Sequence, residues 1–250
     1  MKAIIMAAGI GSRLLGISNG RPKCLITTGK ETLISRMIRL LRQRGVNDIT
    51  VITGYMSNLV RQDLKDEVSY LDNPFYRVTN SIASLWLARE LLTENVILMN
   101  ADIFLEGTIL DMVLSQTKDV VMMSDLTRIE TADFRFGVDG DRILKTGNKL
   151  TNEETDCEYV GVARIDTNFI CQFKKRLEFM VSKGDFNNWW EGVIYSFIEE
   201  GVDIFHEDIK GTFWTEIDNH NDYQRLVYWL SREYPNQNEY REIAGSLSIT

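Results

Sequence analysis

The chain is poor in the residues that build disulfide frameworks and zinc sites. Its 250 residues include three cysteines, three prolines and two histidines. The cysteines form no close-spaced pair and leave an odd number, which fits a reducing cytosol better than a disulfide framework. His206 and His220 lack the spacing of a metal site. We therefore expect a cytoplasmic protein whose cysteines pack as small hydrophobic side chains.

Long apolar segments and an excess of positive charge are also missing. No stretch approaches the ~18 uninterrupted apolar residues of a membrane-spanning helix, and the N-terminus reads as a charged residue and a strand rather than a signal peptide. The formal net charge is −8 and the pI is near 5.0. A broad polyanion-binding surface is therefore disfavoured, and any phosphate site must be a local basic pocket. We expect no membrane span and no nucleic-acid partner.

Strand-like and helix-like segments alternate along the first hundred residues. Apolar runs predict strands at 3–6, 48–53, 68–71 and 96–99, and helices are predicted between them, beginning near residues 32, 57 and 80. This alternation predicts an α/β fold with a Rossmann-like, doubly wound, mainly parallel sheet covered by helices on both faces. No linker divides the chain, so residues 1–250 are expected to form one domain.

The pattern changes after residue 123. Two short strand-like segments, 134–138 and 142–144, flank Asp139-Gly140 and predict a β-hairpin. We expect an insertion around residues 126–160 that covers the site as a lid or a substrate-side element. Residues 158–163 predict a further core strand, and the next helix carries an apolar stripe typical of core packing.

Two more elements are expected near the C-terminus. A second helix is predicted to carry Trp189, Trp190, Glu191, Ile194 and Ile198. A strand over residues 213–218 ends in a carboxylate, and a closing helix begins near Asp222.

The most informative segment follows the first strand. It reads Met6-Ala7-Ala8-Gly9-Ile10-Gly11-Ser12-Arg13, and Pro22-Lys23 comes ten residues later. Small residues after a buried strand let backbone N–H groups approach a phosphate, and the Arg and Lys supply charge for a triphosphate. The glycine spacing fits neither a dinucleotide fingerprint nor a P-loop. An ordinary strand-to-helix turn is the alternative, but such a turn needs neither the Arg nor the Pro-Lys.

Two carboxylates are predicted to lie at the carboxyl ends of strands. Asp102 follows the strand at 96–99, and Asp218 ends the strand at 213–218. Ligands of such sheets bind at this edge, and one or two carboxylates with phosphate oxygens suit Mg²⁺. The alternative for each aspartate is a helix cap. Taken with the glycine-rich turn, the pair favours a magnesium site.

These motifs closely resemble the signature of the nucleotidyltransferases that make activated sugars and activated alcohols. In that family a strand ending Ala-Ala-Gly-x-Gly-x-Arg is followed by Pro-Lys, and Glu-Ile-Asp stands before a helix near the end. The resemblance implies that Arg13 and Lys23 neutralise phosphates and that Asp102 and Asp218 hold magnesium. It also implies that the nucleotide is bound by the residues of the turn and its neighbour, which are Ala7, Ala8, Gly9, Gly11, Ser12 and Ala101.

The segment from Asn73 to Leu85 resembles one branch of this family. Asn-x-x-Tyr precedes Asn-x-x-Ser-Leu, as in the branch of choline-phosphate cytidylyltransferase and its relatives that act on 2-aminoethylphosphonate or phosphorylated amino acids. CTP is therefore the expected nucleotide. Small polar side chains near a helix start are candidates for base and ribose contacts, namely Thr79, Asn80, Ser81 and Ser84. Helix capping is the alternative for Asn80 and Ser81.

The acceptor is left open by the sequence. Tyr159 and Trp190 are candidates for an aromatic wall around an ammonium group, and Glu158 and Glu191 for ion pairs with it. Core packing is the alternative for each. We expect CMP transfer to phosphocholine, 2-aminoethylphosphonate or a phosphorylated amino acid, with release of pyrophosphate. A sugar-1-phosphate nucleotidyltransferase and a non-catalytic nucleotide-binding relative are the alternatives, and the oligomeric state, a homodimer included, is open.

Overall fold

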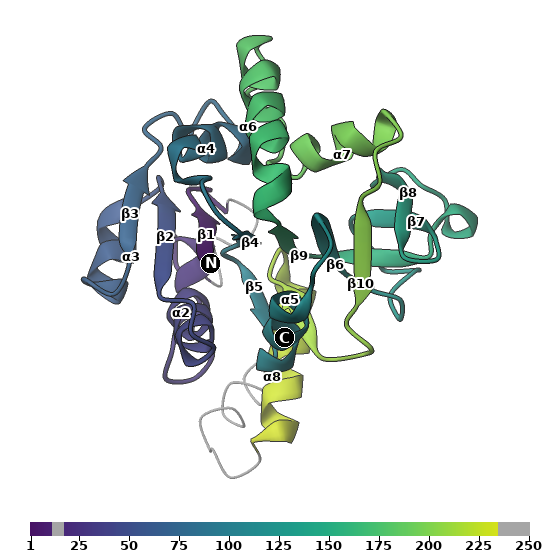
Figure 1. Cartoon of the computed structure of the whole chain (residues 1–250). Helices are drawn as coiled ribbons and strands as arrows, with labels where there is room; N and C mark the ends of the chain where they lie inside the picture. The colour runs from purple at the N-terminus through teal and green to yellow at the C-terminus, as the bar shows by residue number, and fades with distance from the viewer. Residues whose placement is uncertain (12–17, 235–250) are drawn as a thin grey trace.

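The computed structural model describes residues 1–11 and 18–234. In this part of the chain a nine-stranded sheet runs through the molecule in the order β3-β2-β1-β4-β9-β6-β10-β8-β7 (Figure 1). Its strands are β1 (Lys2–Ala7), β2 (Asp48–Thr53), β3 (Ser69–Asp72), β4 (Val96–Asn100), β6 (Val120–Asp125), β7 (Arg135–Asp139), β8 (Arg142–Gly147), β9 (Cys157–Ile165) and β10 (Phe205–Asp208). A second sheet pairs β5 (Ile103–Leu105) with β11 (Trp214–Glu216).

Helices cover both faces of the large sheet. They are α2 (Leu33–Gln43), α3 (Ser57–Leu64), α4 (Ser81–Leu87), α5 (Gly107–Ser115), α6 (Thr167–Ser182), α7 (Gly192–Glu199) and α8 (His220–Glu233), with short 3₁₀ turns at Lys23–Leu25, Arg89–Leu91 and Asn152–Glu154. One core holds buried residues of α2, α3 and α5, and the other holds those of α4, α6 and α7. In β1, Ala3 and Ile5 face the first core and Ile4 and Met6 the second, which explains its continuous apolar run.

The predicted α/β class is confirmed, but the sheet is mixed rather than mainly parallel. β1 pairs in parallel with β2 and β4, and β2 with β3. The mixture begins at β9, which lies antiparallel between β4 and β6, whereas β6 pairs in parallel with β10. The chain reaches β9 through a hairpin instead of a crossover helix, and antiparallel pairing needs no such crossover.

An antiparallel hairpin forms where the sequence predicted one. β7 and β8 pair across Asp139-Gly140, and Gly140 has a φ of +60°, which a glycine tolerates without strain. The hairpin is built into the edge of the large sheet, because β7 pairs with β9 and β8 with β10 (Figure 1). Its two flanks, Phe134 and Asn148, reach the cavity described below.

The prediction that one helix carries Trp189, Trp190 and Glu191 was wrong. α7 begins only at Gly192, and residues 186–191 form a turn docked on the first turn of α4. The Asn80 and Ile82 N–H groups donate to carbonyl oxygens of this turn. The apolar residues Trp190, Ile194 and Ile198 have helical spacing. The hydrogen bonds to α4 nevertheless hold Trp190 outside the helix. Within the described residues, no helix has both the length and the apolar character needed to cross a membrane.

Candidate active site

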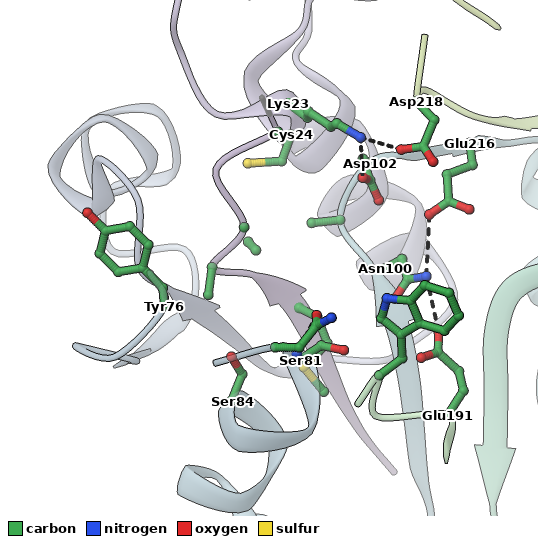
Figure 2. Close-up of a pocket in the computed structure, with 18 of the residues that line it drawn as sticks. Lys23, Cys24, Tyr76, Ser81, Ser84, Asn100, Asp102, Glu191, Glu216 and Asp218 are labelled. Atoms are coloured by element: carbon green, nitrogen blue, oxygen red, sulfur yellow. Dashed lines mark hydrogen bonds and ion pairs between the residues drawn. The ribbon is translucent and has the colours of Figure 1, made fainter. Parts of the chain in front are cut away.

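A cavity of about 610 Å³ opens at the edge of the sheet where β1 and β4 end (Figure 2). Ala7 ends β1, Asn100 ends β4, and both line it. This is the edge at which open α/β sheets bind their ligands. The predicted site residues that line the cavity are Ala7, Ala8, Gly9, Gly11, Lys23, Thr79, Asn80, Ser81, Ser84, Ala101, Asp102, Tyr159, Glu191 and Asp218.

The glycine-rich turn and Lys23 are packed against each other. Gly11 has a φ of +65°, and a Cβ at this position would lie 2.5 Å from Cγ of Lys23. A glycine is therefore required twice over, for the backbone conformation and for the passage of the lysine side chain. Ser12 and Arg13, which the sequence placed at the same site, lie outside the described residues.

Lys23 is held between two carboxylates. Its ammonium is hydrogen-bonded to Asp218 and lies 3.5 Å from Oδ2 of Asp102 (Figure 2). Burial by itself lowers the pKa of the Lys23 ammonium, but the negative charges of Asp102 and Asp218 outweigh burial and leave this pKa above its usual value. The group is therefore a fixed positive charge at the centre of the cavity.

Three carboxylates gather around this lysine. One oxygen each from Asp102, Glu216 and Asp218 lies within 4.8 Å of the others. The antiparallel pairing of β5 with β11 brings them together, since Ile103 lies opposite Glu216 and the Ile217 N–H donates to the Asp102 carbonyl oxygen at 2.9 Å. The two aspartates are thus neighbours, although 116 positions separate them in the sequence.

Glu216 is a member of this cluster that the sequence interpretation missed. The Glu-Ile-Asp motif had been noted, but only its aspartate was assigned to the metal. In the strand predicted over residues 213–218, side chains two positions apart point the same way. Glu216 and Asp218 both line the cavity, although β11 itself ends at Glu216. This period of two was the signal that would have found Glu216.

The cluster carries more negative charge than Lys23 balances. Burial is the main cause that raises the pKa of Asp102, and the negative charge of Asp218 raises it further. Burial, together with the charges of Asp102 and Asp218, holds the pKa of Glu216 well above its usual value. Three oxygen ligands in a half-buried, negatively charged cluster fit a hard divalent cation such as Mg²⁺.

A fourth carboxylate, Glu191, lies next to this cluster. It is 6% exposed, and burial raises its pKa to about 7. Its Oε1 accepts a hydrogen bond of 3.2 Å from Nδ2 of Asn100, which also reaches Oε1 of Glu216 at 3.5 Å (Figure 2). The side chain of Asn100 therefore joins the cluster to the neighbouring part of the cavity.

The start of α4 forms another wall of the cavity. Asn80 caps the helix, since its Oδ1 accepts from the Ser81 N–H at 2.8 Å, and it lines the cavity as well. The two interpretations of this residue, cap and site, are therefore compatible. Asn73, which the sequence interpretation did not assign, donates to Ser84 Oγ at 2.9 Å and to Thr79 Oγ1 at 3.3 Å.

The structure corrects two of the four predicted acceptor residues. Glu158 lies on the opposite side of β9 from Tyr159, because side chains alternate along a strand. There it pairs with Nε of Arg128 at 2.9 Å and accepts the Asp133 N–H at 2.7 Å. Trp190 is fully buried, and its indole N–H donates to Oδ1 of Asn100 at 2.8 Å. Neither side chain lines the cavity.

Other aromatic side chains take the place of Trp190. Trp189, Phe134 and Tyr195 line the cavity beside Tyr159. Phe134 stacks on Tyr195 with ring centroids 4.8 Å apart, and Trp189 meets Phe134 edge-on at 5.8 Å. The hydroxyl of Tyr159 is buried and makes no hydrogen bond with any described residue. Buried polar groups are nearly always satisfied, so this hydroxyl is available to a bound molecule.

Comparisons with known proteins agree with this arrangement. Residues 3–134 match the family model of the MobA-like NTP transferase domain. The choline-phosphate cytidylyltransferase of Streptococcus pneumoniae is 26% identical over 243 residues, covering 93% of this chain and 100% of that protein. The CTP:phosphoglutamine cytidylyltransferase of Campylobacter jejuni is 23% identical over 246 residues, covering 87% and 96%.

A solved structure has the same overall architecture. The CTP:phosphocholine cytidylyltransferase of Streptococcus pneumoniae superposes with a TM-score of 0.76 at 25% identity, covering 92% of this chain and 98% of that one. The family match extends over more than half of the chain, from β1 through the carboxylate at Asp102. The chain therefore belongs to the MobA-like NTP transferase domain family and is a nucleotidyltransferase.

Proposed function

We propose that this protein is a CTP-dependent cytidylyltransferase. It would transfer CMP to the phosphate or phosphonate of a small amine-bearing acceptor and release pyrophosphate. The observation that carries the proposal is the convergence of the glycine-rich turn, Lys23 and three carboxylates on one cavity. The names of the relatives support it, since cytidylyltransferases of phosphocholine and phosphoglutamine match nearly the full length of the chain.

The transfer follows from the charges of the reactants. An oxygen of the acceptor attacks the α-phosphorus of CTP, a P–O bond forms, and the bond from the α-phosphorus to the bridging oxygen breaks, so that its electron pair leaves with pyrophosphate. A phosphate or phosphonate is already an anion near neutral pH, so no side chain has to remove a proton. The protein has to align the reactants and offset the negative charge that develops.

Lys23 and the carboxylate cluster with its metal would together offset the negative charge that develops during transfer. Lys23 is the described cation closest to the proposed phosphate position beside the glycine-rich turn, and Arg13 is expected to assist it. Asp102, Glu216 and Asp218 would hold Mg²⁺, which supplies positive charge to the phosphate oxygens when bound. The chain's own contribution is to fix the carboxylate oxygens of these three residues at one edge of the sheet.

The walls of the cavity suggest how the two substrates are placed. The turn residues Ala7, Ala8, Gly9 and Gly11, together with Ala101, would border the phosphates and ribose. The polar start of α4, with Thr79, Asn80, Ser81 and Ser84, would contact the nucleoside.

Another end of the cavity, beside the turn that docks on α4, suits an ammonium group. It offers the aromatic faces of Phe134, Trp189 and Tyr195 and the carboxylate of Glu191, and both kinds of group attract a cation. The β7–β8 hairpin would act as the lid of this end, because residues at both of its flanks line the cavity. We propose that the whole chain works as one such catalytic domain.

A pyrophosphate-release screen tests the proposal. CTP, UTP, GTP and ATP are each combined with phosphocholine, 2-aminoethylphosphonate, a phosphorylated amino acid and a hexose 1-phosphate, with Mg²⁺ present. We expect release with CTP and one of the phosphorylated amines. Release only with the hexose 1-phosphate would assign the protein to the sugar branch, and none in any pairing would favour a non-catalytic nucleotide-binding relative.

A further inference from the structure

Asn100 makes three hydrogen bonds that connect three neighbouring side chains beside the cavity. Its Oδ1 accepts from Nε1 of Trp190 at 2.8 Å. Its Nδ2 donates to Oε1 of Glu191 at 3.2 Å and to Oε1 of Glu216 at 3.5 Å (Figure 2). The strand β4 thus delivers one amide to a place where a buried indole, the buried carboxylate of Glu191 and the half-buried carboxylate of Glu216 meet.

The indole fixes the orientation of this amide. An indole N–H is a donor only, so the carbonyl oxygen of Asn100 must face Trp190. The two hydrogens of the NH₂ group are then directed at the two carboxylates. In the flipped orientation the carbonyl oxygen would face both carboxylates, and both would lose their donor.

Trp190 is itself held by Ser81, a residue of the proposed nucleotide-binding wall. Its backbone N–H donates to Oγ of Ser81 at 2.9 Å, and its side chain is fully buried in the core that contains α4 and α6. The indole therefore has one position, and the amide of Asn100 takes its orientation from it.

From this geometry we infer that Trp190 and Asn100 are positioning residues that hold Glu216 and Glu191 in their places. Glu216 belongs to the proposed metal cluster and Glu191 to the proposed acceptor site, so the pair couples two neighbouring parts of the cavity. This inference rests on the proposed function for the identity of those two parts. Residues that hydrogen-bond a metal ligand and fix its orientation are important for binding. Their mutation typically lowers metal affinity or activity ~10- to 100-fold.

The test is Trp190→Phe, which removes the indole N–H but keeps an aromatic side chain and the backbone bond to Ser81. Mn²⁺ binding, measured by electron paramagnetic resonance without turnover, is expected to weaken ~10-fold. The KM for the acceptor is expected to rise by a similar factor. CTP binding in the absence of metal should stay unchanged, because the turn and α4 are intact.

A purely structural role for Trp190 predicts a different result. Damage to the fold would lower the melting temperature and weaken metal-free CTP binding together with the other constants. Trp229→Phe is the matched control, because Trp229 stacks on Phe213 at 4.5 Å in the core beneath α8, away from the cavity. It should leave Mn²⁺ and acceptor constants at the wild-type level.

Asn100→Ala completes a double-mutant cycle. If Trp190 acts through Asn100, the double variant should bind Mn²⁺ no more weakly than Asn100→Ala alone. Additive losses, or wild-type Mn²⁺ and acceptor constants in Trp190→Phe, would overturn the inference. The proposed function is tested separately by the wild-type protein, because absence of cytidylyl transfer there would reject it while the Mn²⁺ cycle still reports on the coupling.

Discussion

At the scale of single residues, the central feature of the site is the positive charge of Lys23. One ammonium is surrounded by Asp102, Glu216 and Asp218, two of which contact it directly. In this arrangement the lysine occupies the region in which a divalent cation would bind to the carboxylates. Lys23 therefore has two roles to fill, as counter-ion of these carboxylates and as a positive group for the nucleotide phosphates.

Lys23→Ala separates these two roles. Cytidylyl transfer is expected to fall ~100- to 1,000-fold, because a preorganised charge at the developing negative oxygens is lost. Mn²⁺ binding without nucleotide is expected to become tighter, since the competing ammonium is gone. Lys175→Ala, which removes an exposed lysine of α6, is the control and should change neither value. Wild-type turnover in Lys23→Ala would remove the residue from the mechanism.

Two of the three carboxylates are tested, one at a time. Asp102→Asn should abolish most activity while the melting temperature stays close to that of the wild type. Glu216→Gln keeps the shape of the side chain and removes one negative charge, so Mn²⁺ binding is expected to weaken ~10-fold or more if this oxygen is a ligand. Pyrophosphate release and thermal denaturation test Asp102→Asn, and titration with Mn²⁺ tests Glu216→Gln. Unchanged affinity in Glu216→Gln would restrict the metal site to the two aspartates.

At the scale of secondary-structure elements, the site is assembled from the ends of strands and from one helix start. β1 and β4 run in parallel and end at the same edge, so the glycine-rich turn and Asp102 meet there. β11 reaches the same edge through its pairing with β5. The hairpin β7–β8 contributes the far wall, from a part of the sheet that is antiparallel.

Phe134→Ala tests the contribution of the hairpin. The aromatic ring lies between Tyr195 and Trp189, so its loss should open the acceptor end of the cavity. The KM for the acceptor is expected to rise ~2- to 30-fold, because a cation–π contact is worth about 0.5–2 kcal/mol, while the KM for CTP stays constant. Phe134→Tyr should keep most of the affinity. A change confined to CTP would contradict this placement of the acceptor.

At the scale of the whole molecule, buried acidic groups make stability depend on pH. Burial raises the pKa of Glu158 and of Glu191 to about 7, against a usual value of 4.5. Between these two pH values the folded protein retains protons that the unfolded chain releases. These groups therefore stabilise the fold fully below pH 4.5, and their contribution is lost as the pH rises through about 7.

Glu158→Gln should flatten this dependence. The variant cannot ionise at position 158, so its melting temperature should fall less between pH 5 and pH 7.5 than that of the wild type. The corresponding difference in the free energy of unfolding is on the order of 1–3 kcal/mol. Thermal denaturation at several pH values measures it. Glu153→Gln is the control, because the pKa of this exposed group is lowered by hydrogen bonds and its effect falls at more acidic pH. An identical slope in Glu158→Gln would show that the group titrates normally.

Several features of the fold and site were determined by the sequence alone. The apolar runs specified β1, β2 and β4, because strands buried on both faces are mostly apolar. The glycine-rich turn with Lys23, and the aspartates at two strand ends, identified the centre of the cavity, since local chemistry and strand direction are both readable from the residues. Asp139-Gly140 located the hairpin for the same local reason.

Only the tertiary structure decided which neighbouring side chains reach the cavity. Glu158 and Tyr159 could be told apart only once the face of β9 was known. Trp190 is buried and Trp189 exposed to the cavity because residues 186–191 dock on α4 through hydrogen bonds to a segment more than a hundred positions away. Such contacts depend on the packing of distant elements, and no local pattern of residues encodes them.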